Sequence, residues 1–387
     1  MALSKIDVAN MLTGLVPNDN TIRRPNAKPI IINGNMAVAQ RGISTTSVSN
    51  GDSGYITCDR MRFNESGTMG AALTITQESL TSGNAFLNGF ANAYKVDVTT
   101  ADGSPDADDW SRLNMRFEGQ DVQMFKKGTA NAEKFTLAFW VKATKTGTNT
   151  IELYDNDNNR SVNGSYTIST TNTWEHKVVN FPADTTGAFD DNNAESLRIT
   201  WSLSAGSNYS SGTLASTWGS PTTANAAAGQ VNNFDSTSNN FHITGIQLEV
   251  GEFSSTTLPP FQHESIGDNL ARCQRYYYFH VSEAENSDTD TTISLSSQYN
   301  TSSVKGFINL PTRMRAKPSL KQNTGSNMYR VYENGSNATF TTLTLSAEST
   351  YNTAVFTAGS SVTVTAGSCG ALQTMDGTAF VAFDSEL

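Results

Sequence analysis

Several short runs of this sequence alternate between apolar and polar residues, and this alternation restricts the chain to a β architecture. Residues 113–118 read LNMRFE and residues 135–142 read FTLAFWVK, so every second residue of each run is apolar. Successive side chains of a strand point to opposite faces, so period two places one face on a core and the other in water. No long helical pattern interrupts the series. Further β-type runs lie at residues 72–77, 150–154, 174–181, 197–203 and 241–250.

Composition supports a turn-rich β protein with aromatic cores. The chain has 387 residues, which suggests two or three domains at about 150 residues each. Charged residues make up only 16%, whereas 19 Phe, 12 Tyr and 5 Trp supply large side chains for burial. Regular strands separated by polar turns predict a two-sheet sandwich.

Charge and cysteine usage exclude several classes of function. The net charge is −10, and no basic stripe is visible, so we expect no nucleic-acid binding. Three widely spaced cysteines give neither a disulfide framework nor the paired spacing of a zinc site. The sequence has no apolar run of 18 residues, so we expect no membrane insertion. The first residues lack the apolar run of a signal peptide, so we expect synthesis in a cytoplasm.

Turn-forming and linker-like stretches divide the chain into three parts. We predict an attachment segment, helical or extended, at residues 1–28, a sandwich at residues 29–268 and a smaller β domain at residues 269–387. The last part begins with Tyr276, Tyr277, Tyr278 and Phe279. Because alternate residues of a strand point to opposite sides, we expect one side to pack on its own domain. The other side is expected to pack on the sandwich or on a neighbouring subunit.

Three short blocks occur in a fixed order along the chain. They are INGNMAVAQRG at residues 32–42, ITGIQLEVGE at residues 243–252 and ARCQRYYYF at residues 271–279. In this order the chain resembles tail-fibre and virion structural proteins of tailed phages. The runs TLAFWVKA at residues 136–143, TWEHKVVNF at residues 173–181 and FHITGIQLEVG at residues 241–251 resemble strands of jelly-roll carbohydrate-binding modules.

These resemblances imply an all-β chain in which a jelly-roll sandwich is followed by a smaller β domain. They imply a virion protein, foremost a tail fibre that attaches to the host surface by binding a glycan or receptor without covalent chemistry. The implied partners are other tail or capsid proteins, bound through the N-terminal segment, and further copies in a homotrimer. A purely structural virion component, such as a head fibre or tail adaptor, is the alternative. A glycan depolymerase is the third reading, although we expect no enzyme.

Sugar binding needs aromatic rings for stacking and polar groups for the hydroxyls. Residues 206–229 are rich in Ser, Thr, Ala, Asn and Gly and read as a long exposed loop. Aromatic residues in or beside such loops are less often core residues than those in strands. The candidate carbohydrate-binding residues are therefore Trp218, Tyr209 and Trp110.

Two other motifs suggest chemistry and were weighed against plain turns. Asp155, Asp157 and Asn159 place oxygen ligands at alternate positions, as in a calcium loop, so a structural calcium is one prediction and a solvated turn the other. No further cofactor is predicted. The GDSG run at residues 51–54 echoes a serine-protease motif, but all four histidines follow it, so we interpret it as a turn.

Overall fold

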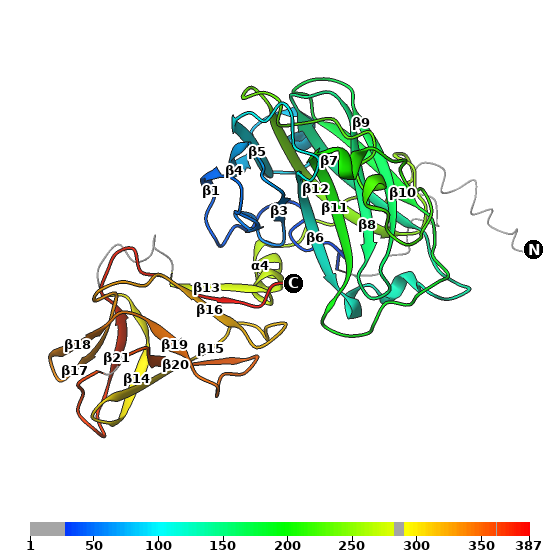
Figure 1. Cartoon of the computed structure of the whole chain (residues 1–387). Helices are drawn as coiled ribbons and strands as arrows, with labels where there is room; N and C mark the ends of the chain where they lie inside the picture. Colours follow the sequence, from blue (N-terminus) through cyan, green and yellow to red (C-terminus); the bar gives the residue numbers. More distant parts are fainter. Residues whose placement is uncertain (1–27, 282–289, 361) are drawn as a thin grey trace, which may run out of the picture.

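The computed structural model describes residues 28–281, 290–360 and 362–387, which form two β domains joined by the helix α4 (Ile266–Gln274) (Figure 1). The predicted attachment segment therefore lies outside the described residues, apart from Lys28. Within the described residues, no helix is long and apolar enough to cross a membrane.

The first domain is a sandwich of two six-stranded sheets, which we call sheet A and sheet B. The neighbouring strands of both sheets pair antiparallel. In spatial order, sheet A contains β1 (Ser44–Val48), β4 (Ala72–Ser79), β5 (Asn92–Thr100), β12 (Asn240–Val250), β7 (Phe135–Ala143) and β10 (Glu175–Phe181). Sheet B contains β2 (Gly54–Tyr55), β3 (Arg62–Ser66), β6 (Trp110–Glu118), β11 (Glu195–Ala205), β8 (Gly147–Asp155) and β9 (Arg160–Ile168). Short helical turns connect some strands: α2 (Gly83–Leu87), η2 (Gly119–Asp121), η3 (Gln123–Phe125), α3 (Ser207–Ser210) and η4 (Thr223–Asn225).

The space between the two sheets is filled by one large hydrophobic core. Trp201 of β11 is fully buried, and its ring meets Phe139 of β7 edge to face, with ring centroids 5.9 Å apart. Phe139 also meets Tyr166 of β9 at 5.0 Å. The apolar residues of each alternating run contribute to this core. The predicted all-β fold with a jelly-roll sandwich is confirmed.

The second domain has its own core, formed by a three-stranded and a seven-stranded sheet. Phe356 and Phe383 meet there with ring centroids 5.7 Å apart. The smaller sheet contains β13 (Tyr277–Val281), β22 (Val381–Asp384) and β16 (Ser319–Gln322). The larger contains β18 (Ser336–Phe340), β17 (Tyr329–Glu333), β21 (Cys369–Thr374), β14 (Thr292–Asn300), β15 (Ser303–Asn309), β20 (Thr353–Ala358) and β19 (Leu343–Leu345). The predicted boundary between residues 268 and 269 falls inside α4.

The three sequence blocks come together where the two domains meet. Asn33 donates its backbone N–H to the side chain of Asn269 at 3.1 Å, and Gln40 donates to the carbonyl of Tyr277 at 2.7 Å. The first block also contacts the second, because Ile246 donates its backbone N–H to the carbonyl of Gly34 at 2.9 Å. The blocks therefore build the domain junction.

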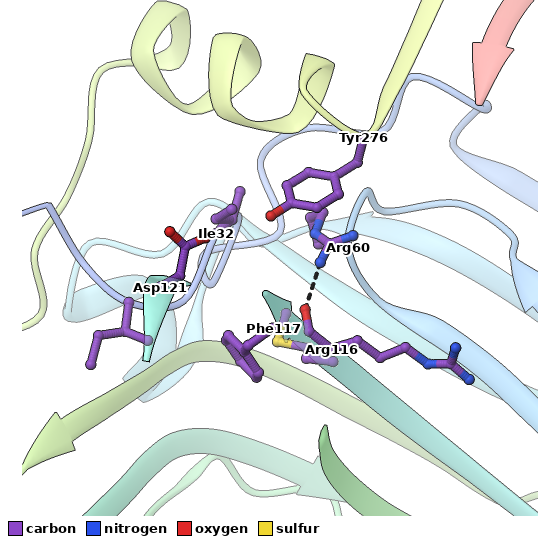
Figure 2. A pocket seen from close by; sticks show the side chains of 8 residues that line it. Ile32, Arg60, Arg116, Phe117, Asp121 and Tyr276 are labelled. Atoms are coloured by element: carbon purple, nitrogen blue, oxygen red, sulfur yellow. Dashed lines mark hydrogen bonds between the residues drawn. The ribbon is translucent and has the colours of Figure 1, made fainter. Parts of the chain in front are cut away.

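The aromatic run at the start of the second domain packs on both domains. The guanidinium of Arg60 lies 3.5 Å from the ring centre of Tyr276, and the Tyr276 hydroxyl donates to Glu118 at 2.6 Å. Tyr278, in contrast, stacks on Phe383 within its own domain. The expected packing against the sandwich is thus confirmed. Figure 2 shows Tyr276 and Arg60 beside a small cavity at the junction, where Arg60 donates to the carbonyl of Arg116 at 2.6 Å.

Candidate functional site

β6 presents polar and charged side chains on the outer face of sheet B. Its apolar residues lie in the core between the sheets, and successive side chains of a strand point to opposite faces. The residues that point outward between them are Arg112, Asn114 and Arg116. The outer face of β6 therefore carries large charged side chains in addition to an amide.

Asn114 lies in a polar line that crosses five neighbouring strands. Its cross-strand partners are Arg62 on β3 and Thr200 on β11. Thr200 is paired in turn with Glu152 on β8, and Glu152 with Asn163 on β9. Because these pairs are in direct register, the residues follow each other at about 4.8 Å per strand. We call these five residues, Arg62, Asn114, Thr200, Glu152 and Asn163, the polar row.

Several buried polar atoms of this face have no hydrogen-bond partner among the residues that the structure describes. Asn114 is 0% exposed, and neither its side-chain nitrogen nor its side-chain oxygen has a partner. Thr200 is 2% exposed, and its hydroxyl has none either. The same holds for Nη1 of Arg62 and Nε of Arg112. An unpartnered buried polar group costs about 1–3 kcal/mol, so a cluster of them requires a functional or structural reason.

Charges of both signs surround Asn114. Burial raises the pKa of Glu152, and the nearby Arg112 and Arg198 oppose this rise. Burial lowers the pKa of Arg112 to about 10, against the opposing effect of Glu152. Glu195 is held by two arginines, with Arg116 at 3.1 Å and Arg198 at 2.5 Å. Glu152 has no ion pair within 4.0 Å in the described part of the chain, and a hydrogen bond with the side chain of Ser161 stabilises its charged form.

Two of the predicted carbohydrate-binding residues meet beside the polar row. Trp110 and Tyr209 have ring centroids 6.1 Å apart and an interplanar angle of 76°. The guanidinium of Arg112 lies 3.5 Å from the ring centre of Trp110. These residues, together with Ser202 and Ala227, line a small hollow of about 20 Å³. The structure therefore joins an aromatic corner to the polar row.

The loop at residues 206–229 borders the other end of the row. Asn163 donates its side-chain nitrogen to the carbonyl of Ala226 at 3.2 Å and its backbone N–H to the carbonyl of Ala215 at 2.7 Å. Gly219 forms a β-bridge with Ser161 of β9. The loop predicted to be exposed is thus anchored along β9 and holds Tyr209 beside β6.

Trp218, the third predicted sugar-binding residue, packs elsewhere. Its indole N–H donates to the carbonyl of Pro182 at 2.8 Å, and its ring lies 5.8 Å from that of Phe135. The ammonium of Lys127 lies 5.1 Å from the ring centre. These contacts belong to the edge of the main core, so we leave Trp218 out of the candidate site.

The predicted calcium ligands already bind protein groups. Asp155 is 0% exposed and pairs with Lys127 at 2.5 Å, so an ammonium neutralises its carboxylate. Asp157 accepts the backbone N–H of Asp190 at 2.9 Å, and Asn159 accepts the hydroxyl of Tyr154 at 2.9 Å. This arrangement does not fit a calcium site, and the described residues contain no group of three or more His, Cys, Asp or Glu placed to hold a metal. Calcium binding stays an untested prediction.

Two other polar regions are closed by their own contacts. A cavity of about 390 Å³ lies beside α4. Both arginines that line it are paired, since Arg272 binds Glu264 at 2.7 Å and Arg275 binds Glu118 at 2.6 Å. On the outer face of sheet A, His242 lies 3.0 Å from Glu78. In these regions, too, buried atoms lack a hydrogen-bond partner among the described residues, namely Oε1 of Glu264 and both ring nitrogens of His242, but a side chain of opposite charge lies beside each of these residues.

Sequence reasoning missed the polar row. The signal was present in LNMRFE, where Asn and Arg occupy the outward positions of a strand whose inward positions are fully apolar. Their partners come from strands far apart in the sequence, so the row depends on a strand pairing that alternation does not specify.

Comparisons with known proteins give distant structural likenesses. No protein-family model and no curated protein matches the sequence. The enzymatically active domain of tailspike protein 4 from bacteriophage CBA120 has 15% identity and a TM-score of 0.28, and the match covers 53% of this chain and 21% of that one. A putative sugar-binding protein from Bacteroides thetaiotaomicron has 13% identity and a TM-score of 0.29, over 58% of this chain and 100% of that one.

A third likeness is to the family 11 carbohydrate-binding module from Clostridium thermocellum, solved in complex with a β-1,3-1,4-mixed-linked tetrasaccharide. It has 11% identity and a TM-score of 0.27, over 55% of this chain and 99% of that one. At these TM-scores the likenesses carry no argument about function. The function of this chain has to be argued from its own residues.

Proposed function

We propose that this chain binds a glycan on the outer face of sheet B, along the polar row and against Trp110. The observation that carries the proposal is Asn114, which lies in the registered polar row, is 0% exposed and has no partner among the described residues for either of its side-chain polar atoms. Sugar hydroxyls both donate and accept, so they match an amide, a hydroxyl and a carboxyl in line. The indole ring beside the row supplies the apolar surface on which a sugar ring stacks.

The binding is proposed to be non-catalytic. Glycoside hydrolysis uses two carboxyl groups that flank the scissile bond. Glu152 is the one acidic residue in the polar row, and nearby Glu195 is already held by Arg116 and Arg198. A depolymerase is therefore less well supported than a binding protein.

We further propose that the chain works in a phage virion, as a tail fibre that attaches to the host surface. This part rests on the resemblance of the three sequence blocks to tail-fibre and virion proteins. A virion component without receptor binding is the alternative, and it would leave the unpartnered groups around Asn114 without a role. Other tail or capsid proteins remain the proposed partners of the N-terminal segment.

The proposed homotrimer is supported by an apolar face on the second domain. Leu295 is 76% exposed, Phe307 65% and Tyr332 43%. Leu295 and Tyr332 are both paired with Ala371, so these side chains share one face of the seven-stranded sheet. The neighbouring Lys305 is paired with Glu348 within the chain. This pair neutralises Lys305 beside the face, on a chain of net charge −10, and an exposed apolar face of this kind favours a second copy as its occupant.

If copies of the chain associate through this face, a substitution that disrupts the face should lower the mass of the particle in solution. We expect the wild type to sediment as a trimer and Leu295→Ser to sediment as a smaller species, because the substitution places a polar group in the apolar contact. A monomeric wild type, or a variant of unchanged mass, would contradict the assignment.

Several weak glycan sites held in one trimer would raise avidity by roughly 10² to 10⁴.

The glycan-binding proposal is tested by replacing Trp110 and measuring retention on immobilised bacterial surface polysaccharides. We expect Trp110→Ala to weaken binding roughly tenfold, which is within the range of about 1–3 kcal/mol that an aromatic ring contributes when a nucleic-acid base stacks on it. Trp218→Ala is the matched control. It should lower the melting temperature, because Trp218 packs on the core, but leave the affinity of the folded protein unchanged. Equal binding by wild type and Trp110→Ala would contradict the site.

A further inference from the structure

Two arginines beside Asn114 form no close ion pair with the described residues, although Glu152 and Glu195 act on them at longer range. Arg62 and Arg112 are half-buried, and in the described parts of the chain neither lies within 4.0 Å of a carboxylate. Nη1 of Arg62 and Nε of Arg112 are buried without a hydrogen-bond partner. A buried guanidinium normally gains a carboxylate or carbonyl partner, because desolvation of an unpaired charge is costly.

Other arginines of the sandwich show what such pairing looks like. Arg160 holds Asp184 at 2.8 Å, and Arg198 holds Glu195 at 2.5 Å. Arg112 instead stacks on Trp110, and Arg62 faces Asn114 across the strand pair. The two free guanidinium groups therefore flank the same unpartnered amide from β3 and β6.

The row is asymmetric in charge. Arg62 and Arg112 lie on the β3–β6 side of Asn114, whereas Glu152 lies on β8, beyond Thr200. A ligand that crosses the row meets cations at one end and an acceptor at the other. A neutral sugar would satisfy the acceptor end and leave both guanidinium groups without an anion in direct contact.

We propose that the ligand is an acidic glycan, whose carboxylate or phosphate binds between Arg62 and Arg112 while its hydroxyls bind Asn114, Thr200 and Glu152. The inference rests on the proposed glycan-binding function. A planar guanidinium donates two parallel hydrogen bonds to either anion, so both sources share one recognition chemistry. The net charge of −10 makes this local concentration of arginine more notable, because the rest of the chain repels such a ligand.

The test uses four immobilised probes: polygalacturonate, its carboxyl-reduced form, a poly(glycerol phosphate) teichoic acid and neutral dextran. The full chain is applied as wild type, as Arg112→Gln and as Arg62→Gln, and glutamine keeps hydrogen-bond donors while removing the charge. Arg313→Gln is the matched control, because Arg313 also stacks on an aromatic ring, with its guanidinium 4.7 Å from the centre of Tyr351, but lies in the other domain. Melting temperatures establish that each variant is folded.

We expect retention on polygalacturonate or on teichoic acid, and roughly tenfold weaker retention for Arg112→Gln and Arg62→Gln, with Arg313→Gln unchanged. Retention on polygalacturonate that is lost after carboxyl reduction assigns the carboxylate, and retention on teichoic acid alone assigns the phosphate. Equal retention on dextran and the acidic probes, still weakened by Trp110→Ala, would overturn the acidic ligand and leave glycan binding intact. Retention on none of the four probes would overturn both.

Discussion

Asn114 is the residue on which the account depends most. It is fully buried, its side-chain amide has no partner in the described residues, and it lies between Arg62 and Thr200 on neighbouring strands. A residue kept for stability would not leave two polar atoms unsatisfied. A residue kept for ligand binding can leave polar atoms unsatisfied, because the protein gives up stability to preserve a group that the ligand needs.

A binding role and a structural role of Asn114 predict opposite effects of its replacement on stability. Asn114→Val removes the unpartnered amide and adds a residue that favours strands, so we expect the free energy of unfolding to rise by about 1 kcal/mol. Polysaccharide retention should fall at least tenfold in the same variant. Denaturant unfolding and the retention assay measure the two effects. A lower stability with unchanged retention would mean that Asn114 is a structural residue.

The alternation of single residues predicted much of the fold. It placed the apolar residues of β6 and β7 in the core, and the loop argument named Trp110 and Tyr209, which lie beside the polar row. It also chose Trp218, which lies in the same loop but turns back onto Phe135. Loop composition indicates exposure of the backbone, but it does not indicate which aromatic ring packs inward.

At the scale of elements, the sandwich depends on a close approach between the first sequence block and β12. The carbonyl of Gly34 accepts the backbone N–H of Ile246, and a Cβ on Gly34 would lie 2.2 Å from the carbonyl oxygen of Ile246. Any side chain at this position would therefore push the block away from β12. The glycine of INGN is required by packing and not by a positive φ.

We accordingly expect Gly34→Ala to lower the free energy of unfolding by about 2 kcal/mol, in the range of a strained or overpacked core substitution. Gly103→Ala is the control, because its Cβ would meet nothing within 4 Å. The free energies are compared by urea denaturation. If the two variants unfold at the same urea concentration, the block does not depend on this contact.

At the scale of the whole molecule, charged contacts hold the two domains together. Glu386 pairs with Arg41 at 3.1 Å and also with Arg60, and all three side chains are largely buried. Arg116, on the outer face of sheet B, donates to the main-chain oxygen of Leu387 at 2.8 Å. The junction therefore lies next to the candidate site (Figure 1).

Replacement of Glu386 tests the strength of this junction. Glu386→Gln leaves Arg60 buried without its carboxylate, so we expect the free energy of unfolding to fall by about 3 kcal/mol. Glu348→Gln is the matched control, since its pair with Lys305 at 2.7 Å is exposed and should change stability by less than about 1 kcal/mol. Similar losses in the two variants would show that the junction does not rely on the buried pair.

The most direct test of glycan binding on sheet B is a ¹⁹F NMR titration of the chain labelled with 5-fluorotryptophan. The chain has 5 tryptophans, and each resonance can be assigned by a Trp→Phe substitution. On addition of an oligosaccharide cut from a retained polysaccharide, the account predicts a shift of the Trp110 resonance, with the buried Trp201 and the core-packed Trp218 unchanged. A shift at Trp218 with none at Trp110 would contradict the account.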